Sequence, residues 1–338
     1  MKAVVFRSGK GLVYQDVPDY EVNDGEVLVK VADTGFCGSD HSLVKIGLVP
    51  DGYILGHEIS GVVVEKGAGA KGPDLGTKVC IRPTFCGECP NCLKGKPHMC
   101  TMNRRTAGIG DLNGGFAEYV KVFPGMLIPI PDGVDSKNAA LAETFAAALH
   151  GIRQTEGDPG SALVMGGGPI GLCAVRLLKI LGHYPIVAVE PIDAKRNIAL
   201  AYGADHALHP QAANEEIAAF SGGSFERIFE CSGVVDNIGR AIDLAGIGGQ
   251  VCIISMIFQP FTVPEPYKMN LKEIKMAASM SNTHEENIEC LNWMAEGLID
   301  AHPLITDYAP LERLPELYQT RIDTGQAIKA LLQIGEEF

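Results

Sequence analysis

The stretch Ser161-Ala-Leu-Val-Met-Gly-Gly-Gly-Pro-Ile-Gly171 gives the strongest indication of the fold. Its first half is typical of a short buried strand, and the amphipathic segment after it predicts a helix over about 170–181. The glycines at 166, 168 and 171 form the pattern G-x-G-x-x-G, which is weak alone in a chain with 40 glycines. Between strand and helix it predicts a tight turn, close approach of a pyrophosphate to the backbone, and phosphates facing the helix N-terminus.

An acidic residue completes this dinucleotide pattern. Glu190 ends the next apolar stretch, about 20 residues after the glycines. Its carboxylate would accept hydrogen bonds from both hydroxyls of the adenine ribose and repel a 2′-phosphate, which favours NAD over NADP. Lys195 and Arg196 follow, however, and either could reach a phosphate. The competing interpretation is a glycine turn in a βαβ unit with an exposed Glu. The predicted NAD-binding residues are Gly166, Gly168, Pro169, Ile170, Gly171, Glu190 and Lys195.

The 338 residues show two different patterns of predicted secondary structure, which suggest two domains. Apolar strands alternate with helical segments from about 161 to 255, which predicts right-handed crossovers and a parallel sheet. Residues 1–140 instead contain short strands rich in Val and Ile between Gly and Pro turns, a pattern that suits a small irregular β-barrel or sandwich. The Ala-rich segment 136–154 predicts a helix with Ser136 as its N-cap, and 285–338 contains a further helix and a final strand over 327–334.

Composition excludes several classes of protein. The net charge of −13 disfavours nucleic acid as a partner, because phosphate binding needs a basic face. The longest apolar run, near 162–181, is interrupted by Arg176 and Lys179, so no membrane span is expected. Residues 1–20 lack the apolar segment of a signal peptide. Ten cysteines without such a signal favour a reducing, cytoplasmic location and metal binding rather than disulfides.

Four of these cysteines, Cys86, Cys89, Cys92 and Cys100, lie in one stretch with spacings x2, x2 and x7. Four thiolates so close in sequence can surround one metal ion, and the absence of an open position indicates a structural zinc. An iron–sulfur cluster is the alternative metal site, but its usual bacterial spacing ends in x3 followed by Cys-Pro. The remaining alternative is four free thiols in a turn-rich loop.

A second candidate metal site combines Cys37-Gly-Ser-Asp40 with Gly56-His-Glu58. A thiolate and an imidazole suit zinc, and a carboxylate can complete three protein ligands. A lone Cys and a lone His are more often core residues. Here the glycines, the following Glu and the dinucleotide pattern favour a functional site.

Together these motifs resemble the zinc-containing medium-chain dehydrogenases, the superfamily of alcohol, sorbitol and threonine dehydrogenases. The resemblance covers essentially the whole chain and includes Gly114-Gly-Phe-Ala-Glu-Tyr119 between the cysteines and the glycine pattern. It implies a GroES-like irregular β-barrel catalytic domain at 1–145 and 287–338, with a zinc lobe at about 82–103. It also implies a Rossmann NAD-binding domain, a doubly wound parallel sheet, at 146–286.

The resemblance further implies a catalytic zinc held by Cys37 and His57, with Glu58 beside or on the metal. A further ligand in the family usually comes from the segment entering the central helix, where polyol dehydrogenases tend to place Glu. Glu143 takes that position and resembles the sorbitol-type branch, although Thr144 stands where Pro is usual. The other interpretation of Glu143 is a carboxylate in the first turn of a helix, favoured by the helix dipole.

The implied catalytic residues are Ser39, Asp40 and Glu58. Asp40 is expected to orient the zinc-ligand His, a role compatible with capping its own helix. Ser39 is expected to bond the substrate oxygen and pass its proton outward. The family often continues that relay to a group five residues after the ligand Cys, where this chain has Ser42; His41 comes one residue earlier and is favoured as a surface or core histidine.

The reaction implied is hydride transfer between a secondary alcohol and NAD, with zinc as Lewis acid. A polyol or sugar alcohol is favoured, with a threonine-type amino alcohol or a cyclic or simple secondary alcohol as alternatives. Met256, Ile257 and Phe258 either line an apolar part of the substrate site or belong to the core. Relatives without zinc that reduce quinones, or that have no enzyme activity, are remote alternatives. A homodimer or homotetramer is expected, with 250–260 as either an interface strand or an internal strand.

Overall fold

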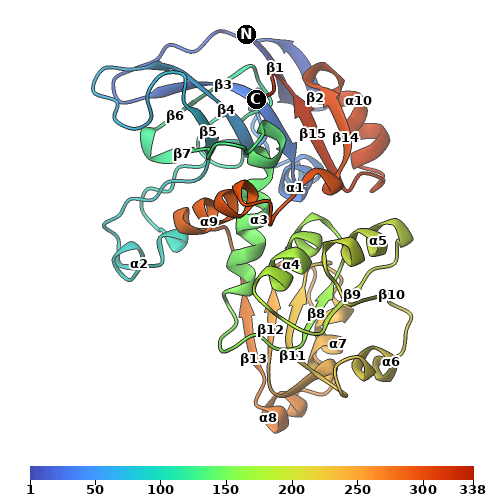
Figure 1. Ribbon diagram of the computed structural model, residues 1–338. Helices are drawn as coiled ribbons and strands as arrows, with labels where there is room; N and C mark the ends of the chain where they lie inside the picture. The colour runs from blue at the N-terminus through green and yellow to red at the C-terminus, as the bar shows by residue number, and fades with distance from the viewer. The chain divides into compact units, whose positions relative to one another are not determined.

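The computed structural model describes residues 1–338, which fold as two compact units. The first contains Met1–Glu143 and Asn287–Phe338, and the second contains Thr144–Glu286 (Figure 1). None of the helices has both the length and the apolar character needed to cross a membrane.

The first unit is built on strands that are mostly antiparallel. A seven-stranded sheet has the order β14-β15-β3-β4-β5-β7, and β6 also pairs with β3. Only β14 and β15 run parallel within it, and β1 and β2 form a separate hairpin. The strands are β1 (Lys2–Arg7), β2 (Gly11–Asp16), β3 (Val27–Phe36), β4 (Glu58–Lys66), β5 (Lys78–Ile81), β6 (Tyr119–Val122), β7 (Leu127–Pro129), β14 (Ile305–Pro310) and β15 (Lys329–Gln333).

Alternating apolar residues explain how this sheet closes around a core. Val27, Val29 and Val31 of β3 are completely buried and pack with Ile59 and Val63 of β4. The unit also contains short helices: α1 (Gly38–Ile46), α2 (Pro90–Leu93) in the cysteine lobe, α10 (Leu314–Leu317), and a π-helical turn at Tyr318–Ile322. Longer helices, α3 (Ser136–Ile152) and α9 (His284–Ala295), run across the boundaries between the two units in sequence.

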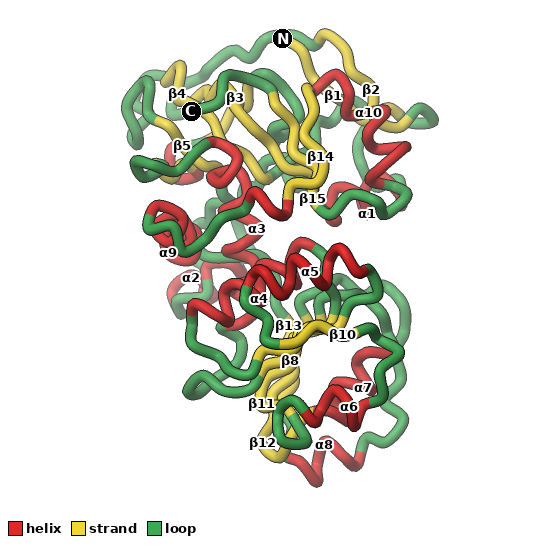
Figure 2. Tube along the Cα trace, turned by 45° about the vertical axis from the view of Figure 1, so that its right-hand side comes forward, coloured by secondary structure: helices red, strands yellow, loops and turns green.

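The second unit is a six-stranded parallel sheet with the order β10-β9-β8-β11-β12-β13. Helices α4 and α5 cover one face, while α6 and α7 lie on the other (Figure 2). The strand order reverses direction between β8 and β11, where ligands of such sheets bind. The strands are β8 (Ala162–Met165), β9 (Ile186–Val189), β10 (His206–Leu208), β11 (Phe225–Glu230), β12 (Ala245–Ile253) and β13 (Lys275–Ala278). The helices are α4 (Pro169–Ile180), α5 (Asp193–Tyr202), α6 (Asn214–Ala219), α7 (Asp236–Leu244) and α8 (Tyr267–Lys272).

The predicted fold class, an irregular β unit joined to a doubly wound parallel sheet, is confirmed. The predicted cap of α3 is wrong. Asp135 caps the helix, accepting the N–H of Asn138 at 2.9 Å, while Ser136 is the first helical residue. A carboxylate is a stronger acceptor for helix N-terminal amides than a hydroxyl, since its charge also complements the helix dipole.

Candidate functional site

The first candidate site forms around the N-terminus of α1. Cys37 precedes the helix, and the buried Asp40 carboxylate accepts its N–H at 2.9 Å. The other oxygen of Asp40 accepts the N–H of Gly56 at 3.4 Å and lies 3.3 Å from Nδ1 of His57. Asp40 therefore caps α1 and contacts both segments that carry Cys37 and His57.

Three potential metal ligands converge at this point. The ligand atoms of Cys37, His57 and Glu58 lie within 4.8 Å of one another. Burial lowers the pKa of His57, but the Asp40 carboxylate and the Cys37 thiol outweigh it and raise that pKa well above its usual value. Because Nδ1 faces Asp40, Nε2 remains on the side of Ser39, whose Oγ is 3.4 Å away. A thiolate, an imidazole and a carboxylate form a donor set that fits zinc with one open position.

Lys329 is a functional neighbour of this group that the sequence analysis missed. Its Nζ lies 2.6 and 2.9 Å from the two carboxylate oxygens of Glu58, and both side chains are at most 1% exposed. Lys329 is on β15 and Glu58 is on β4, with β3 between them. The contact requires Gly35 in β3, because an added Cβ there would lie 1.9 Å from the Glu58 carboxylate. The available signal was a single charged residue in the apolar strand predicted over 327–334.

Glu143 does not belong to the group of three ligands within 4.8 Å. It lies inside α3, whose first turn contains no acidic residue, so its interpretation as a first-turn carboxylate is wrong. Its charge raises the pKa of Arg104, partly offsetting the larger lowering that burial causes. Glu143 is therefore in electrostatic contact with a guanidinium.

The two residues considered for a proton relay face other partners. Ser42 donates its hydroxyl to the carbonyl oxygen of Gly38 at 3.0 Å, within its own helix. His41 packs against the ring of Tyr318, with 5.8 Å between ring centroids, and its Nε2 lies 3.8 Å from Asp323. Burial lowers the pKa of His41, and Lys45 lowers it further. These contacts agree with the interpretation of His41 as a packing residue.

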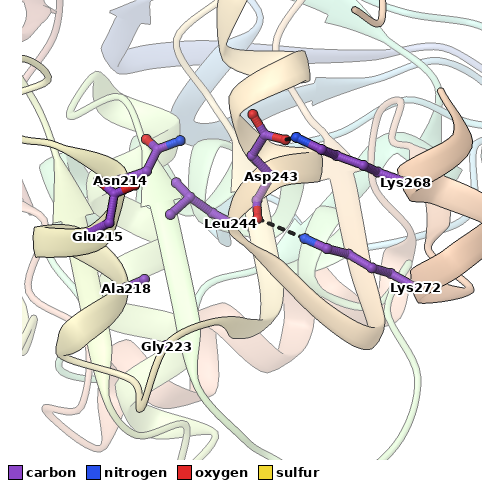
Figure 3. Close-up of a pocket in the computed structure, with 8 residues that line it drawn as sticks. All are labelled: Asn214, Glu215, Ala218, Gly223, Asp243, Leu244, Lys268 and Lys272. Carbon is purple, nitrogen blue, oxygen red and sulfur yellow. Dashed lines mark hydrogen bonds and ion pairs between the residues drawn. The ribbon is translucent and has the colours of Figure 1, made fainter. Parts of the chain in front are cut away.

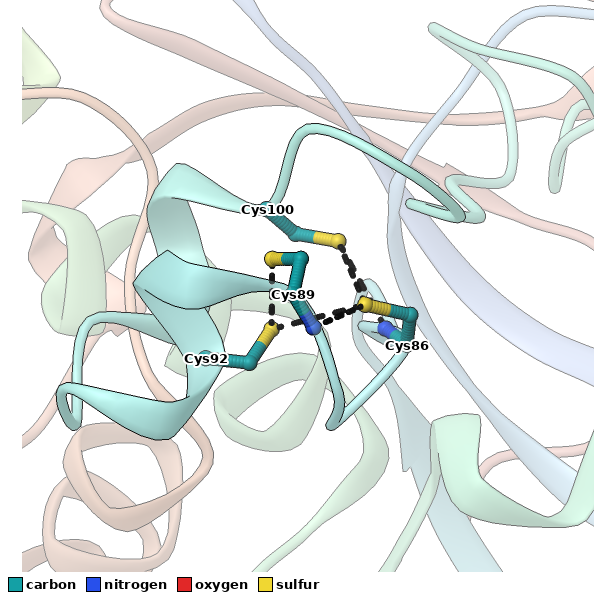
Figure 4. A group of neighbouring side chains, drawn as sticks. All are labelled: Cys86, Cys89, Cys92 and Cys100. Carbon is teal, nitrogen blue, oxygen red and sulfur yellow. Dashed lines mark hydrogen bonds between the residues drawn. The ribbon is translucent and has the colours of Figure 1, made fainter.

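The four cysteines of the lobe converge as their spacing predicts (Figure 4). The Sγ atoms of Cys89 and Cys92 are 3.5 Å apart, as are those of Cys86 and Cys100, and Cys86 lies 3.8 Å from Cys92. A tetrahedron with zinc–sulfur bonds of about 2.3 Å has edges of about 3.8 Å. Backbone N–H groups, above all that of Thr101, lower the pKa of Cys89 to about 6, which favours its thiolate. The donor set fits a closed zinc site.

The glycine pattern adopts the geometry that a dinucleotide needs. Gly166 has φ +106°, a conformation that favours glycine. An added Cβ on Gly171 would lie 1.8 Å from the carbonyl oxygen of Gly166, so helix and turn pack too closely for a side chain. At Gly168, the N-cap of α4, an added Cβ would meet nothing within 4 Å. That open space, beside Pro169 and Ile170 in the first turn, fits a pyrophosphate at the helix N-terminus.

Glu190 lies over this turn and is only 5% exposed, so the interpretation of an exposed Glu is wrong. Its carboxylate accepts the N–H groups of Gly167 at 2.7 Å and Ile192 at 3.0 Å. Arg196 donates to the backbone oxygen of Glu190 at 2.5 Å and bonds to Asp193. Lys195 is half-buried on α5. Arg196 therefore bonds to a residue of its own helix, Asp193, and to the backbone at the end of the preceding strand.

A separate hollow of about 300 Å³ lies on the second unit between α6, α7 and α8 (Figure 3). Lys272 donates to three backbone oxygens near the end of α7, those of Ile242, Asp243 and Ala245, at 2.8–3.1 Å. Lys268 pairs with the Asp243 carboxylate at 2.6 Å. Lys272 therefore caps the C-terminus of α7, and none of the predicted site residues lines this hollow.

Comparison with known proteins shows which family the chain resembles over most of its length. Residues 23–132 match the family model of the alcohol dehydrogenase GroES-like domain, and residues 169–296 match that of zinc-binding dehydrogenases. The chain is 32% identical over 343 residues to a sorbitol dehydrogenase of Halalkalibacterium halodurans, covering 98% of this chain and 99% of that protein. It is 31% identical over 325 residues to a 2-dehydro-3-deoxy-L-galactonate 5-dehydrogenase of Pseudoalteromonas atlantica, covering 93% of each. A solved zinc-binding dehydrogenase of Sinorhizobium meliloti 1021, bound to NADP, superposes with a TM-score of 0.90 at 30% identity over 98% of both chains.

Proposed function

The chain belongs to the zinc-binding dehydrogenase family, and we propose that it oxidises a secondary alcohol of a polyol or sugar alcohol with NAD as hydride acceptor. It is an oxidoreductase of the alcohol dehydrogenase type. The single observation that carries the proposal is the convergence of Cys37, His57 and Glu58 within 4.8 Å, in a chain with a dinucleotide turn. Relatives that act on sorbitol and on a sugar acid support a hydroxylated substrate.

Each residue of the two candidate metal sites has a defined role in this proposal. Cys37 and His57 would hold the catalytic zinc with Glu58 beside them, and the four-cysteine lobe would hold a second zinc. The catalytic zinc supplies a Lewis acid that makes an alcohol oxygen more acidic, and NAD supplies the hydride acceptor. Asp40 orients the ring of His57, and Ser39 Oγ takes the proton of the substrate hydroxyl while its own hydroxyl proton passes outward to water. Glu143 is proposed to lie near the metal as in polyol dehydrogenases, either directly or through water.

A substrate panel tests the proposal. Purified protein is assayed for NADH formation with sorbitol, other polyols, threonine, and simple and cyclic secondary alcohols. We expect turnover of a polyol with NAD. Turnover of threonine alone would favour the amino-alcohol alternative. Turnover of an unsubstituted secondary or cyclic alcohol alone would favour the alternative of a simple or cyclic alcohol dehydrogenase. No turnover in protein that holds two zinc ions would rule out all the substrates in the panel.

NAD is proposed over NADP because of Glu190, although solved relatives hold either NADP or NADH. We expect Glu190→Gln to lower the preference for NAD over NADP at least about tenfold, since the repulsion between the carboxylate and a 2′-phosphate disappears. The ratio of kcat/KM for the two cofactors measures this effect. Glu216→Gln, an exposed carboxylate on α6, is the matched control. An unchanged ratio in Glu190→Gln would show that other groups select the cofactor.

We also propose that the protein forms a homo-oligomer through an edge strand of the sheet in the second unit. Residues 250–253 belong to β12, which is paired on both sides, so this part of the segment is an internal strand, the second of the two expected alternatives. Strand β13 is one of the two edge strands of this sheet. Met280 follows β13 and is 55% exposed, while Met256 and Phe258 follow the neighbouring β12 and are 72% and 62% exposed. Apolar side chains beside an unpaired strand edge favour association with a second copy. Sedimentation equilibrium of the wild type and Phe258→Asp should show a dimer or tetramer that the substitution weakens.

A cytoplasmic location is proposed from the cysteines. All ten are free, and the four of the lobe must stay reduced to bind a metal. Fractionation of the cells that produce the protein checks this.

A further inference from the structure

The buried carboxylate of Glu230 has no role in the chemistry described above. Glu230 ends β11, the strand next to β8 at the point where the strand order reverses, and its side chain is completely buried. A carboxylate at such a depth is costly unless each of its oxygens accepts hydrogen bonds. The hydrogen-bond donors that surround this carboxylate therefore indicate what it does in the structure.

Each oxygen of Glu230 accepts one backbone and one hydroxyl hydrogen bond. Oε1 accepts the N–H of Ser232 at 2.9 Å and the hydroxyl of the same residue. Oε2 accepts the N–H of Gly233 at 3.2 Å and the hydroxyl of Ser255. Ser232 and Gly233 belong to the loop after β11, and Ser255 follows β12. One side chain thus holds two loops together at the carboxyl ends of neighbouring strands.

The loop after β11 also packs directly on the glycine turn. The N–H of Cys231 donates to the carbonyl oxygen of Met165 at 2.8 Å. An added Cβ on Gly166 would lie 2.8 Å from the Cα of Ser232. Any movement of this loop would therefore change the surface beside the dinucleotide turn.

We infer that Glu230 is a positioning residue for the nicotinamide half of the cofactor, because it fixes the loops after β11 and β12 against the glycine turn. The inference rests on the proposed function. In sheets of this type, each half of the sheet receives one mononucleotide of the cofactor. The half from β8 to β10 carries the glycine turn, which would receive the pyrophosphate, and Glu190, which would bind the adenine ribose. The half from β11 to β13, whose first loops Glu230 ties together, is left for the nicotinamide.

The substitution Glu230→Gln tests the inference, because glutamine has almost the same size and shape as glutamate. An amide has one acceptor oxygen and one NH₂ group, so NH₂ must face the backbone N–H of either Ser232 or Gly233. Hydroxyls can rotate to accept, but a backbone N–H cannot. We expect the Kd for NADH, measured by calorimetry, to rise about tenfold or more. The Kd for ADP-ribose, which lacks the nicotinamide, should stay within about twofold.

Two further variants complete the design. Ser255→Ala removes one hydroxyl donor and should weaken NADH binding in the same direction by a smaller factor, even if Glu230→Gln fails to fold. Glu226→Gln changes an exposed carboxylate at the other end of β11 and should bind both ligands as the wild type does.

The outcomes separate this inference from the proposed function. Unchanged NADH binding in Glu230→Gln would overturn the inference. If Glu230→Gln does not fold, unchanged NADH binding in Ser255→Ala would overturn it. Equal weakening of NADH and ADP-ribose would also overturn it, since that result indicates general damage to the domain. A wild-type protein that binds neither ligand would overturn the proposed function itself.

Discussion

Replacing Cys37 with serine is expected to lower kcat for alcohol oxidation roughly 1,000-fold and to remove one of two zinc ions per chain. A serine hydroxyl is a poor zinc ligand compared with a thiolate. The metal supplies several kcal/mol of charge stabilisation in the transition state, and each 1.36 kcal/mol corresponds to a factor of ten in rate. Loss of about 4 kcal/mol therefore corresponds to about three orders of magnitude. Zinc content by mass spectrometry and NADH formation by absorbance measure the two effects.

Cys80→Ser is the matched control for this experiment. Cys80 is buried in β5, and its thiol donates to the carbonyl oxygen of Ala139 at 3.0 Å. A serine hydroxyl can keep that bond, so this variant should hold two zinc ions and remain active. Cys100→Ser should also lose one zinc ion, but from the lobe, where no open position serves catalysis. Full activity and two zinc ions in Cys37→Ser would contradict the assignment of the catalytic site.

The features predicted from sequence are those that neighbouring residues determine. The glycine turn depends partly on local features, namely the positive φ of Gly166 and the close approach of Gly171 to the carbonyl oxygen of Gly166, so its spacing predicts it when a strand precedes it and a helix follows. The convergence of the four cysteines likewise depends on a single short loop. The parallel sheet followed from the alternation of apolar strands and amphipathic helices, a property that extends over the whole second unit.

The features missed depend on strand register or on competition between adjacent polar groups. Lys329 meets Glu58 only because β15 and β4 flank β3, and because Gly35 leaves room between them. No local pattern contains that information. The helix cap moved by one residue because Asp135 and Ser136 are both good caps. The edge position of β13 depends on the order of the strands, which hydrophobicity alone does not reveal.

The contact between Lys329 and Glu58 leads to the second large expected effect. Lys329→Met should lower the free energy of unfolding by about 3–5 kcal/mol, because it leaves the buried Glu58 carboxylate without its cation. Methionine has a similar length and fills the same space, so a cavity contributes little. Both side chains are at most 1% exposed, so solvent does not screen the pair. Denaturant unfolding in the presence of a chelator measures the loss.

Two matched changes separate the charge effect from packing. Lys329→Met combined with Glu58→Gln removes both charges and should recover most of the lost stability, because no buried carboxylate remains without a cation. Lys45→Met removes an exposed pairing with Asp323, 3.1 Å away, and should change stability by less than about 1 kcal/mol. Adding zinc to Lys329→Met should restore part of the loss, since the carboxylate freed from Lys329 can then bind the metal held by Cys37 and His57. Equal stability of Lys329→Met and the wild type in chelator would mean that Glu58 is protonated in the folded protein and that no buried ion pair supports the site.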